Sequence, residues 1–230
     1  MSSLIRVFEI QVPEITDVSA DSNNTPLTPL ASRITDNIMD ALGNGNPSRD
    51  FTVNEMEIND RAQVHCEKWV EEVGYHFVRY SNSKKPDLIY PINQSGNRNV
   101  LKSKVYSGDV SGTIGESLFS LYIIKCFFLS DGDFAHLRTD NSSVYPDFAI
   151  YTPSQEMLSN FGWPEVSEIP AEVKNANELE RSAIYPQIRK SIQQIRSFWR
   201  RRGATAGPSM IGVTVRNQRQ QTYDLAVIWR

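Results

Sequence analysis

Three charged residues interrupt two apolar segments that are otherwise typical of buried strands. Asp147 lies within residues 145–151, and Glu172 and Lys174 lie within residues 169–175. Side chains two residues apart point to the same face of a strand, so Glu172 and Lys174 share one face and Val173 takes the other. If the two segments are neighbouring strands, Asp147 and Glu172 meet at one edge of a sheet.

Two carboxylates at one place repel each other unless a cation lies between them. Their oxygen atoms suit Mg²⁺, with Mn²⁺ as a substitute. A lysine beside them can balance charge and orient a water molecule for attack on a phosphodiester. The competing interpretation is a solvated strand end with an ordinary ion pair. The acid–x–lysine triplet is weak support by itself, because about one is expected by chance at this composition.

The elements that would position these residues follow from apolar periodicity and from capping residues. Helical spacing predicts helices over residues 28–42, 59–73, 113–129 and 178–202. Alternating or β-branched runs predict strands over residues 4–12, 75–80, 87–90, 134–138, 145–151, 169–175, 210–216 and 222–229. Residues 92–112 and 153–167 are expected to be a long polar arm and an inserted loop. The order of elements predicts a mixed sheet flanked by helices, in the α/β or α+β class.

Pro146-Asp147 followed by Glu172-Val173-Lys174 resembles the motif of the PD-(D/E)xK nuclease superfamily, which includes many type II restriction endonucleases. The start of the 113–129 helix is similar to the position from which that superfamily often takes an extra acidic residue, here Glu116. The superfamily core has a helix, three strands, a helix and a further strand. The resemblance therefore implies a restriction-endonuclease-like core over residues 111–230, with residues 1–110 as an N-terminal extension of helices and strands.

The roles of the site residues follow from this resemblance. Asp147 and Glu172 would bind Mg²⁺. Glu116 and the Val173 carbonyl would be further ligands. Lys174 would position or deprotonate the attacking water and balance charge in the transition state. An alternative for Glu116 is a carboxylate that simply interacts with the positive end of its helix.

The function that the resemblance implies is a Mg²⁺-dependent endodeoxyribonuclease. The narrowest form is a type II restriction enzyme that acts as a homodimer on double-stranded DNA. One alternative is a structure-specific or non-specific nuclease in repair, mobile-element handling or phage defence. Another is a non-catalytic nucleic-acid-binding module on a nuclease-like fold.

Basic residues are concentrated near the C-terminus. Residues 1–177 hold 14 basic and 24 acidic residues, whereas residues 178–220 hold nine basic and two acidic ones. On the 178–202 helix, a polar stripe opposite the isoleucines is predicted to contact phosphates: Arg189, Gln193, Arg196 and Arg200. A merely solvated face is the alternative. Lys102 and Lys104 of the polar arm are predicted to bind nucleic acid as well. The arm, the inserted loop and the N-terminal helices are expected to supply base contacts or the dimer surface.

Several other classes of protein and site are not expected. No apolar run has the length of a membrane span, the N-terminus lacks the layout of a signal peptide, and no glycine-rich nucleotide loop is present. Cys66 and Cys126 are isolated, and the histidines His65, His76 and His136 lack ligand spacing, which favours surface or structural roles. We expect a cytoplasmic protein with reduced thiols, no membrane partner and no nucleotide cofactor.

Overall fold

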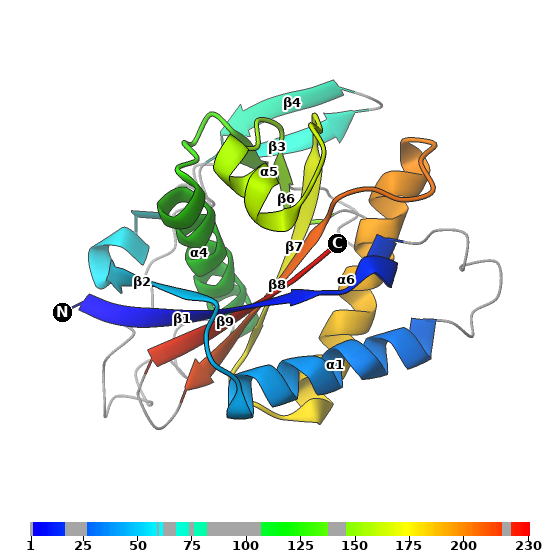
Figure 1. Cartoon of the computed structure of the whole chain (residues 1–230). Helices are drawn as coiled ribbons and strands as arrows, with labels where there is room; N and C mark the ends of the chain where they lie inside the picture. Colours follow the sequence, from blue (N-terminus) through cyan, green and yellow to red (C-terminus); the bar gives the residue numbers. More distant parts are fainter. Residues whose placement is uncertain are drawn as a thin grey trace.

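The computed structural model describes an α+β protein with a seven-stranded mixed sheet flanked by helices (Figure 1). Lys102, Lys104 and the strand predicted over residues 87–90 lie outside the described residues. Within the part that is described, no helix is long and apolar enough to cross a membrane. The described residues are 2–16, 27–58, 60–61, 68–73, 76–81, 107–137, 146–217 and 222–230.

The strands of the main sheet follow the spatial order β2-β1-β9-β8-β7-β6-β5. Their bounds are β1 (Ser2–Gln11), β2 (Arg49–Asn54), β5 (Phe134–His136), β6 (Phe148–Ile150), β7 (Ile169–Ala176), β8 (Met210–Asn217) and β9 (Thr222–Trp229). The β1–β9 and β7–β8 pairs are parallel, and the other neighbouring pairs are antiparallel. A separate antiparallel pair consists of β3 (Lys68–Val73) and β4 (His76–Ser81).

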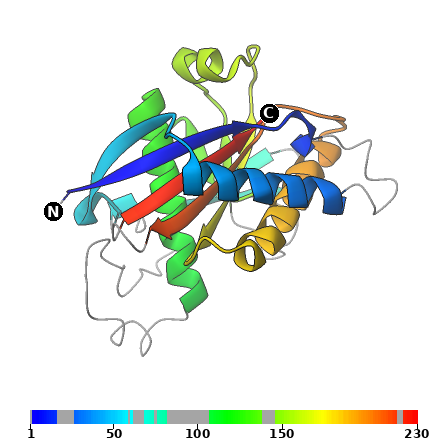
Figure 2. The ribbon, with the colours of Figure 1, turned by 60° about the horizontal axis from the view of Figure 1, so that its bottom comes forward.

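Helices cover both faces of the main sheet. On one face lie α4 (Ser107–Phe127) and the short α5 (Gln155–Phe161). On the other lie α1 (Leu27–Asn44), α6 (Arg181–Arg201) and the 3₁₀ turn η1 (Pro13–Thr16). Figures 1 and 2 show α1 and α6 together on one side of the strands and α4 on the opposite side. The fold therefore has three layers and two hydrophobic cores.

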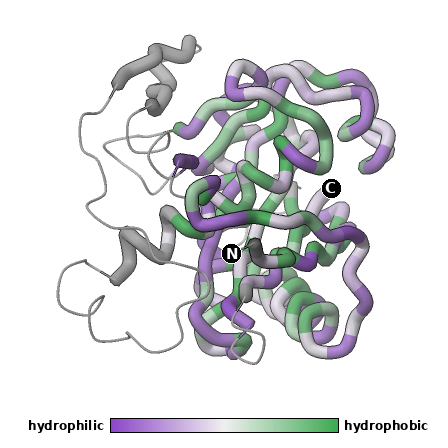
Figure 3. The backbone as a smooth tube through the Cα atoms, turned by 90° about the vertical axis from the view of Figure 1, so that its left-hand side faces the viewer, coloured by the Kyte–Doolittle hydropathy of each residue, from purple (hydrophilic) through white to green (hydrophobic). Residues whose placement is uncertain are grey.

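The core between the sheet and α6 follows the isoleucine stripe that the sequence predicts. Ile184, Ile188, Ile192 and Ile195 are all completely buried. Each fully buried isoleucine contributes roughly 1.5–3 kcal/mol relative to an exposed one. In Figure 3, hydrophobic and hydrophilic residues alternate in short stretches along the tube, as expected for elements with one buried side.

The N-terminal strands belong to the same sheet as the C-terminal ones. β1 lies between β2 and β9, and its Arg6 donates to both carboxylate oxygens of Asp224 on β9, at 2.9 and 2.7 Å. The boundary predicted between residues 110 and 111 therefore does not divide the sheet.

The helix predicted over residues 59–73 is wrong for its last six residues. Lys68–Val73 form strand β3, which pairs with His76–Ser81 in antiparallel register. The aromatic and β-branched residues of this segment favour a strand, whereas its apolar spacing favours a helix. The local sequence therefore supports both structures. Pairing with a neighbouring strand decided between the two.

The inserted segment at residues 153–167 is a helix and its flanks, not only a loop. Ser154 caps the N-terminus of α5 by accepting a hydrogen bond from the Met157 backbone N–H, and Gly162 ends the helix at φ 62°. Phe161 is buried on the α4 face of the sheet. The serine cap and the glycine stop are the sequence features that would have predicted this helix.

Helix α4 approaches β7 closely at a glycine. A Cβ atom at Gly115 would lie 3.1 Å from Thr214 Oγ1 and 3.2 Å from Asn175 Cβ. One turn earlier, a Cβ at Gly112 would meet no atom within 4 Å. The absence of a side chain at Gly115 thus allows α4 to bring its next residue, Glu116, up to the end of β7.

We predict that Gly115→Val lowers the free energy of unfolding by about 1–3 kcal/mol, because the added methyl groups overpack the α4–β7 contact. Gly112→Val is the matched control on the same helix, and it should leave stability within about 0.5 kcal/mol of the wild type. Urea denaturation of the three proteins provides the measurement. Equal losses in both variants would contradict a specific close approach at residue 115.

Candidate active site

Strand register brings the two predicted carboxylates together. In the antiparallel β6–β7 pair, Phe148 lies opposite Ala171. Asp147 directly precedes β6, and Glu172 directly follows Ala171, so the same register sets Asp147 beside Glu172. Toward its C-terminus, β7 continues past the first residue of β6 and ends at Ala176. The carboxylates therefore meet where β7 loses its antiparallel neighbour.

Reciprocal hydrogen bonds hold the two carboxylates in place. The Asp147 backbone N–H donates to Glu172 Oε2 at 3.0 Å, and the Val173 backbone N–H donates to Asp147 Oδ2 at 2.8 Å. Glu172 is completely buried, whereas the Asp147 side chain is 23% exposed. Each carboxylate is thus bonded to the strand that carries the other, and only Asp147 is open to solvent.

The Lys174 ammonium lies between the two carboxylates. It forms a close ion pair with Glu172 Oε1, and it is 3.7 Å from Asp147 Oδ2. Val173 belongs to the hydrophobic core on the α4 face. The predicted alternation along this strand, with Glu172 and Lys174 on one side and Val173 on the other, is confirmed.

A third carboxylate comes from α4. Glu116 Oε2 is 3.1 Å from His136 Nε2 on the edge strand β5. Glu116 also lines the same cavity as Asp147 and Lys174. The structure therefore brings Glu116 to the predicted site. His136 is a site residue that the sequence did not reveal, because its contact with Glu116 joins two elements without any regular spacing.

A cavity of about 550 Å³ opens beside these residues. Its wall on the α4 and β7 side includes Glu116, Asp147, Val173 and Lys174. Glu172 is not part of the wall and lies behind Lys174. The lining residues from α6 and the segment before it are Asn177, Pro186, Gln187 and Lys190.

The electrostatics of the site reflect burial and a shortage of positive charge. Burial raises the pKa of Asp147, and the nearby Glu116 raises it further, while Lys174 opposes both effects. Burial and the Asp147 charge raise the pKa of Glu172 well above its ordinary value. Burial alone would lower the pKa of Lys174, but the two carboxylates outweigh it and raise that pKa. The three carboxyl groups thus favour an added cation.

The residues fit a divalent cation by donor type. Asp147 and Glu116 offer carboxylate oxygens to the cavity, and hard cations such as Mg²⁺ prefer oxygen ligands. Among the described residues, no group of three or more acidic, histidine or cysteine side chains is already arranged around one point. Glu172 would join such a site only if Lys174 moved away, since its Oε1 is bonded to that ammonium.

The four α6 residues predicted to contact phosphates differ in their exposure to solvent. Arg189, Gln193 and Arg200 are exposed, but none of them lines the cavity. Arg196 is only 2% exposed, and its guanidinium donates to the backbone carbonyls of Ile15, at 3.3 Å, and Glu14, at 3.2 Å. The prediction that Arg196 contacts phosphate is therefore wrong: η1 covers this part of α6, and the arginine ties the two together.

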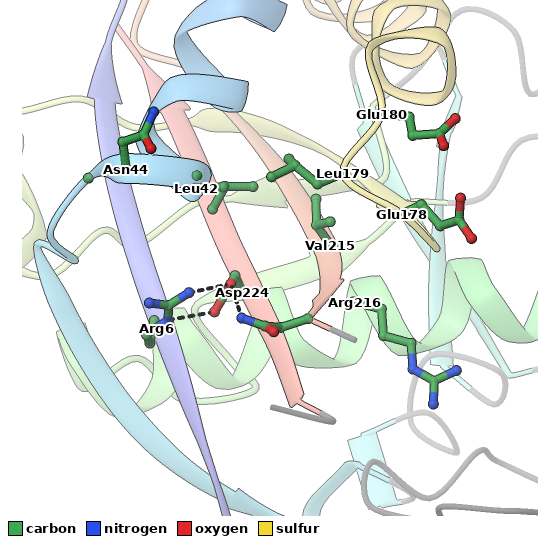
Figure 4. A pocket seen from close by; sticks show the side chains of 12 residues that line it. Arg6, Leu42, Asn44, Glu178, Leu179, Glu180, Val215, Arg216 and Asp224 are labelled. Atoms are coloured by element: carbon green, nitrogen blue, oxygen red, sulfur yellow. Dashed lines mark hydrogen bonds and ion pairs between the residues drawn. The ribbon is translucent and has the colours of Figure 1, made fainter. Parts of the chain in front are cut away.

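A second cavity, of about 650 Å³, lies between the C-terminal end of α1, the middle of β1 and the adjoining ends of β8 and β9 (Figure 4). Asp224, at its centre, accepts hydrogen bonds from Arg6 and, at 3.1 Å, from Asn217 Nδ2. These contacts join three neighbouring strands. None of the residues predicted to bind a metal lines this cavity.

We predict that the metal-free protein loses stability as the pH rises above the ordinary carboxyl range, because the pKa values of Asp147 and Glu172 are raised in the folded state. The folded protein holds protons on Asp147 and Glu172 at pH values where the unfolded chain, with ordinary carboxyl pKa values, has released them. The folded state therefore binds more protons, and its advantage falls with rising pH. Thermal unfolding in EDTA should show this fall, and Mg²⁺ should reduce it.

In Glu172→Gln, stability should depend less steeply on pH, because glutamine does not titrate and one buried carboxyl group with a raised pKa is removed. Glu156→Gln, an exposed change on α5, is the matched control and should follow the wild type. Parallel profiles for wild type and Glu172→Gln would exclude a raised pKa at Glu172.

A separate prediction concerns Arg196. Arg196→Met keeps most of the apolar volume but leaves the carbonyls of Ile15 and Glu14 without this donor, so it should lower the free energy of unfolding by about 1–3 kcal/mol. Arg189→Met, on the exposed side of the same helix, should change it by less than about 0.5 kcal/mol. Urea denaturation compares the two, and an unchanged Arg196→Met protein would contradict the structural role.

Comparisons of the chain with protein-family models, with curated proteins and with solved structures find no match. The likeness to the PD-(D/E)xK nucleases therefore rests on the residues Asp147, Glu172 and Lys174 and on the elements that carry them.

Proposed function

We propose that this protein is a Mg²⁺-dependent endonuclease that hydrolyses phosphodiester bonds in DNA. The observation that carries the proposal is the cluster formed by Asp147, Glu172 and Lys174, of which Asp147 and Lys174 line a cavity. A buried excess of carboxylates is costly unless a cation offsets it, and such arrangements are typical of catalytic sites.

The order of elements supports a restriction-endonuclease-like core. The chain passes from α4 to the antiparallel strands β5 and β6, then through the inserted helix α5 to β7, and finally through α6 to β8, which is parallel to β7. Apart from α5, this is the order of helix, three strands, helix and strand that the resemblance implies. The two strands that carry the site, β6 and β7, are neighbours at the positions where the motif requires them.

Each residue has a role that its surroundings support. Asp147 and Glu116 face the cavity and would hold the cation, with the Val173 carbonyl as a further oxygen donor. The cation would supply Lewis-acid activation of the phosphate and acidify a water molecule. The Lys174 ammonium stabilises negative charge on the reacting phosphate, and Glu172 holds that ammonium in place.

The narrower role is a type II restriction endonuclease that acts as a homodimer and cuts both strands of a short site. Base contacts or the dimer surface would come from the N-terminal helices, the inserted segment of residues 153–167 and the predicted arm of residues 92–112. The arm prediction is wrong for residues 107–112, which form the start of α4. The alternatives, a structure-specific or non-specific nuclease and a non-catalytic binding module, differ from it in the products that they leave.

We predict that purified protein converts plasmid and phage DNA to discrete fragments in Mg²⁺ and not in EDTA. Lys174→Ala should lower the cleavage rate by about 100-fold or more, because charge on the reacting phosphate loses its partner, while DNA binding changes little. Glu156→Ala, an exposed carboxylate on α5, is the control and should cut like the wild type.

The products separate the possible functions. Discrete bands support the restriction role, and a metal-dependent smear supports a nuclease without sequence specificity. Binding without cleavage, on DNA and on RNA, would support the binding module. Full activity of Lys174→Ala would refute the assigned site.

A further inference from the structure

The wall of the active-site cavity opposite the carboxylates is formed by α6, through a face different from the predicted arginine stripe. Gln187 and Lys190 line the cavity, and they lie three residues apart, on the same side of the helix. Arg189 is exposed but does not line the cavity. The cation of α6 that faces the candidate site is therefore Lys190.

The position of this face is set by a hydrogen bond to β7. Gln187 Nε2 donates to the backbone carbonyl of Asn175 at 3.3 Å, one residue beyond Lys174. Gln187 thereby anchors the first half of α6 against the strand that carries Glu172 and Lys174. Lys190 follows less than one turn later and is exposed, so its ammonium can extend over the cavity mouth.

The charges around the cavity show why a second lysine matters there. Counted as fully ionised, the side chains of Glu116, Asp147, Glu172, Lys174 and Lys190 together carry a formal charge of −1. A bound divalent cation would change this to +1, and without Lys190 the total would be zero. A phosphodiester is an anion, so the contribution of Lys190 decides whether the loaded cavity attracts it.

We propose that Lys190 binds a DNA backbone phosphate beside the reacting one and so positions the strand across the cavity. This inference rests on the proposed nuclease function and adds the residue that holds the substrate. Lysine acts here as a flexible point charge with three donors, which suits a phosphate whose exact orientation varies with sequence. Lys190 affects substrate binding, whereas Lys174 acts on the chemical step.

The test compares wild type, Lys190→Ala, Lys190→Arg and, as the control, Arg181→Ala, which removes an exposed cation of the same helix that pairs with Asp36 away from the cavity. Binding of a labelled duplex of about 30 base pairs is measured by fluorescence anisotropy in EDTA over a salt series from about 50 to 200 mM. Lys190→Ala should weaken binding several-fold and reduce the slope of log affinity against log salt by about 1. Lys190→Arg should restore both the affinity and the slope. Arg181→Ala should leave the affinity unchanged and change the slope by no more than about 0.1.

Cleavage kinetics in Mg²⁺ complete the test. Lys190→Ala should raise KM with kcat within about threefold of wild type, because the lost contact is made equally in the ground state and the transition state. Equal effects of Lys190→Ala and Arg181→Ala, or no effect of Lys190→Ala on the salt slope, would overturn the role of Lys190. Wild-type protein that binds DNA through Lys190 but does not cut it would refute the nuclease function alone. Protein that does not bind DNA would refute both.

Discussion

The candidate site depends on one buried interaction, the ion pair between Lys174 and Glu172. A wholly buried carboxylate is stable in a protein only when hydrogen bonds and an opposite charge replace the water it has lost. Lys174 supplies the charge, and the Asp147 backbone N–H supplies a hydrogen bond. The ion pair lies within β7, whereas the hydrogen bond from Asp147, which directly precedes β6, ties Glu172 to the neighbouring strand.

The rest of the fold supports this pair from both sides of the sheet. On one side, α4 approaches closely at Gly115 and delivers Glu116 to the cavity wall. On the other side, Gln187 anchors α6 to the end of β7. The site therefore lies at a junction of three elements, and its polar groups sit on helices and strands whose positions are determined by two packed hydrophobic cores. Such a framework suits a site that must hold charges at set distances.

The candidate site holds more acidic than basic side chains. Burial raises the pKa values of Asp147 and Glu172, and the neighbouring carboxyl groups add to this effect, while Lys174 opposes it only in part. A bound cation would lower both pKa values. Perturbed carboxyl groups of this kind are typical of functional sites.

The sequence by itself determined the local patterns. Period-two alternation placed Glu172 and Lys174 on one side of a strand, and isoleucines at helical spacing identified the buried side of α6, because both patterns depend only on backbone geometry. Contacts between distant segments were decided by the tertiary structure alone. The burial of Arg196 beneath η1, the His136–Glu116 contact and the choice of Lys190 as the cation facing the cavity all depend on which elements pack together. Spacing along one helix shows which side is apolar, but the neighbour that covers each polar position comes from elsewhere in the chain.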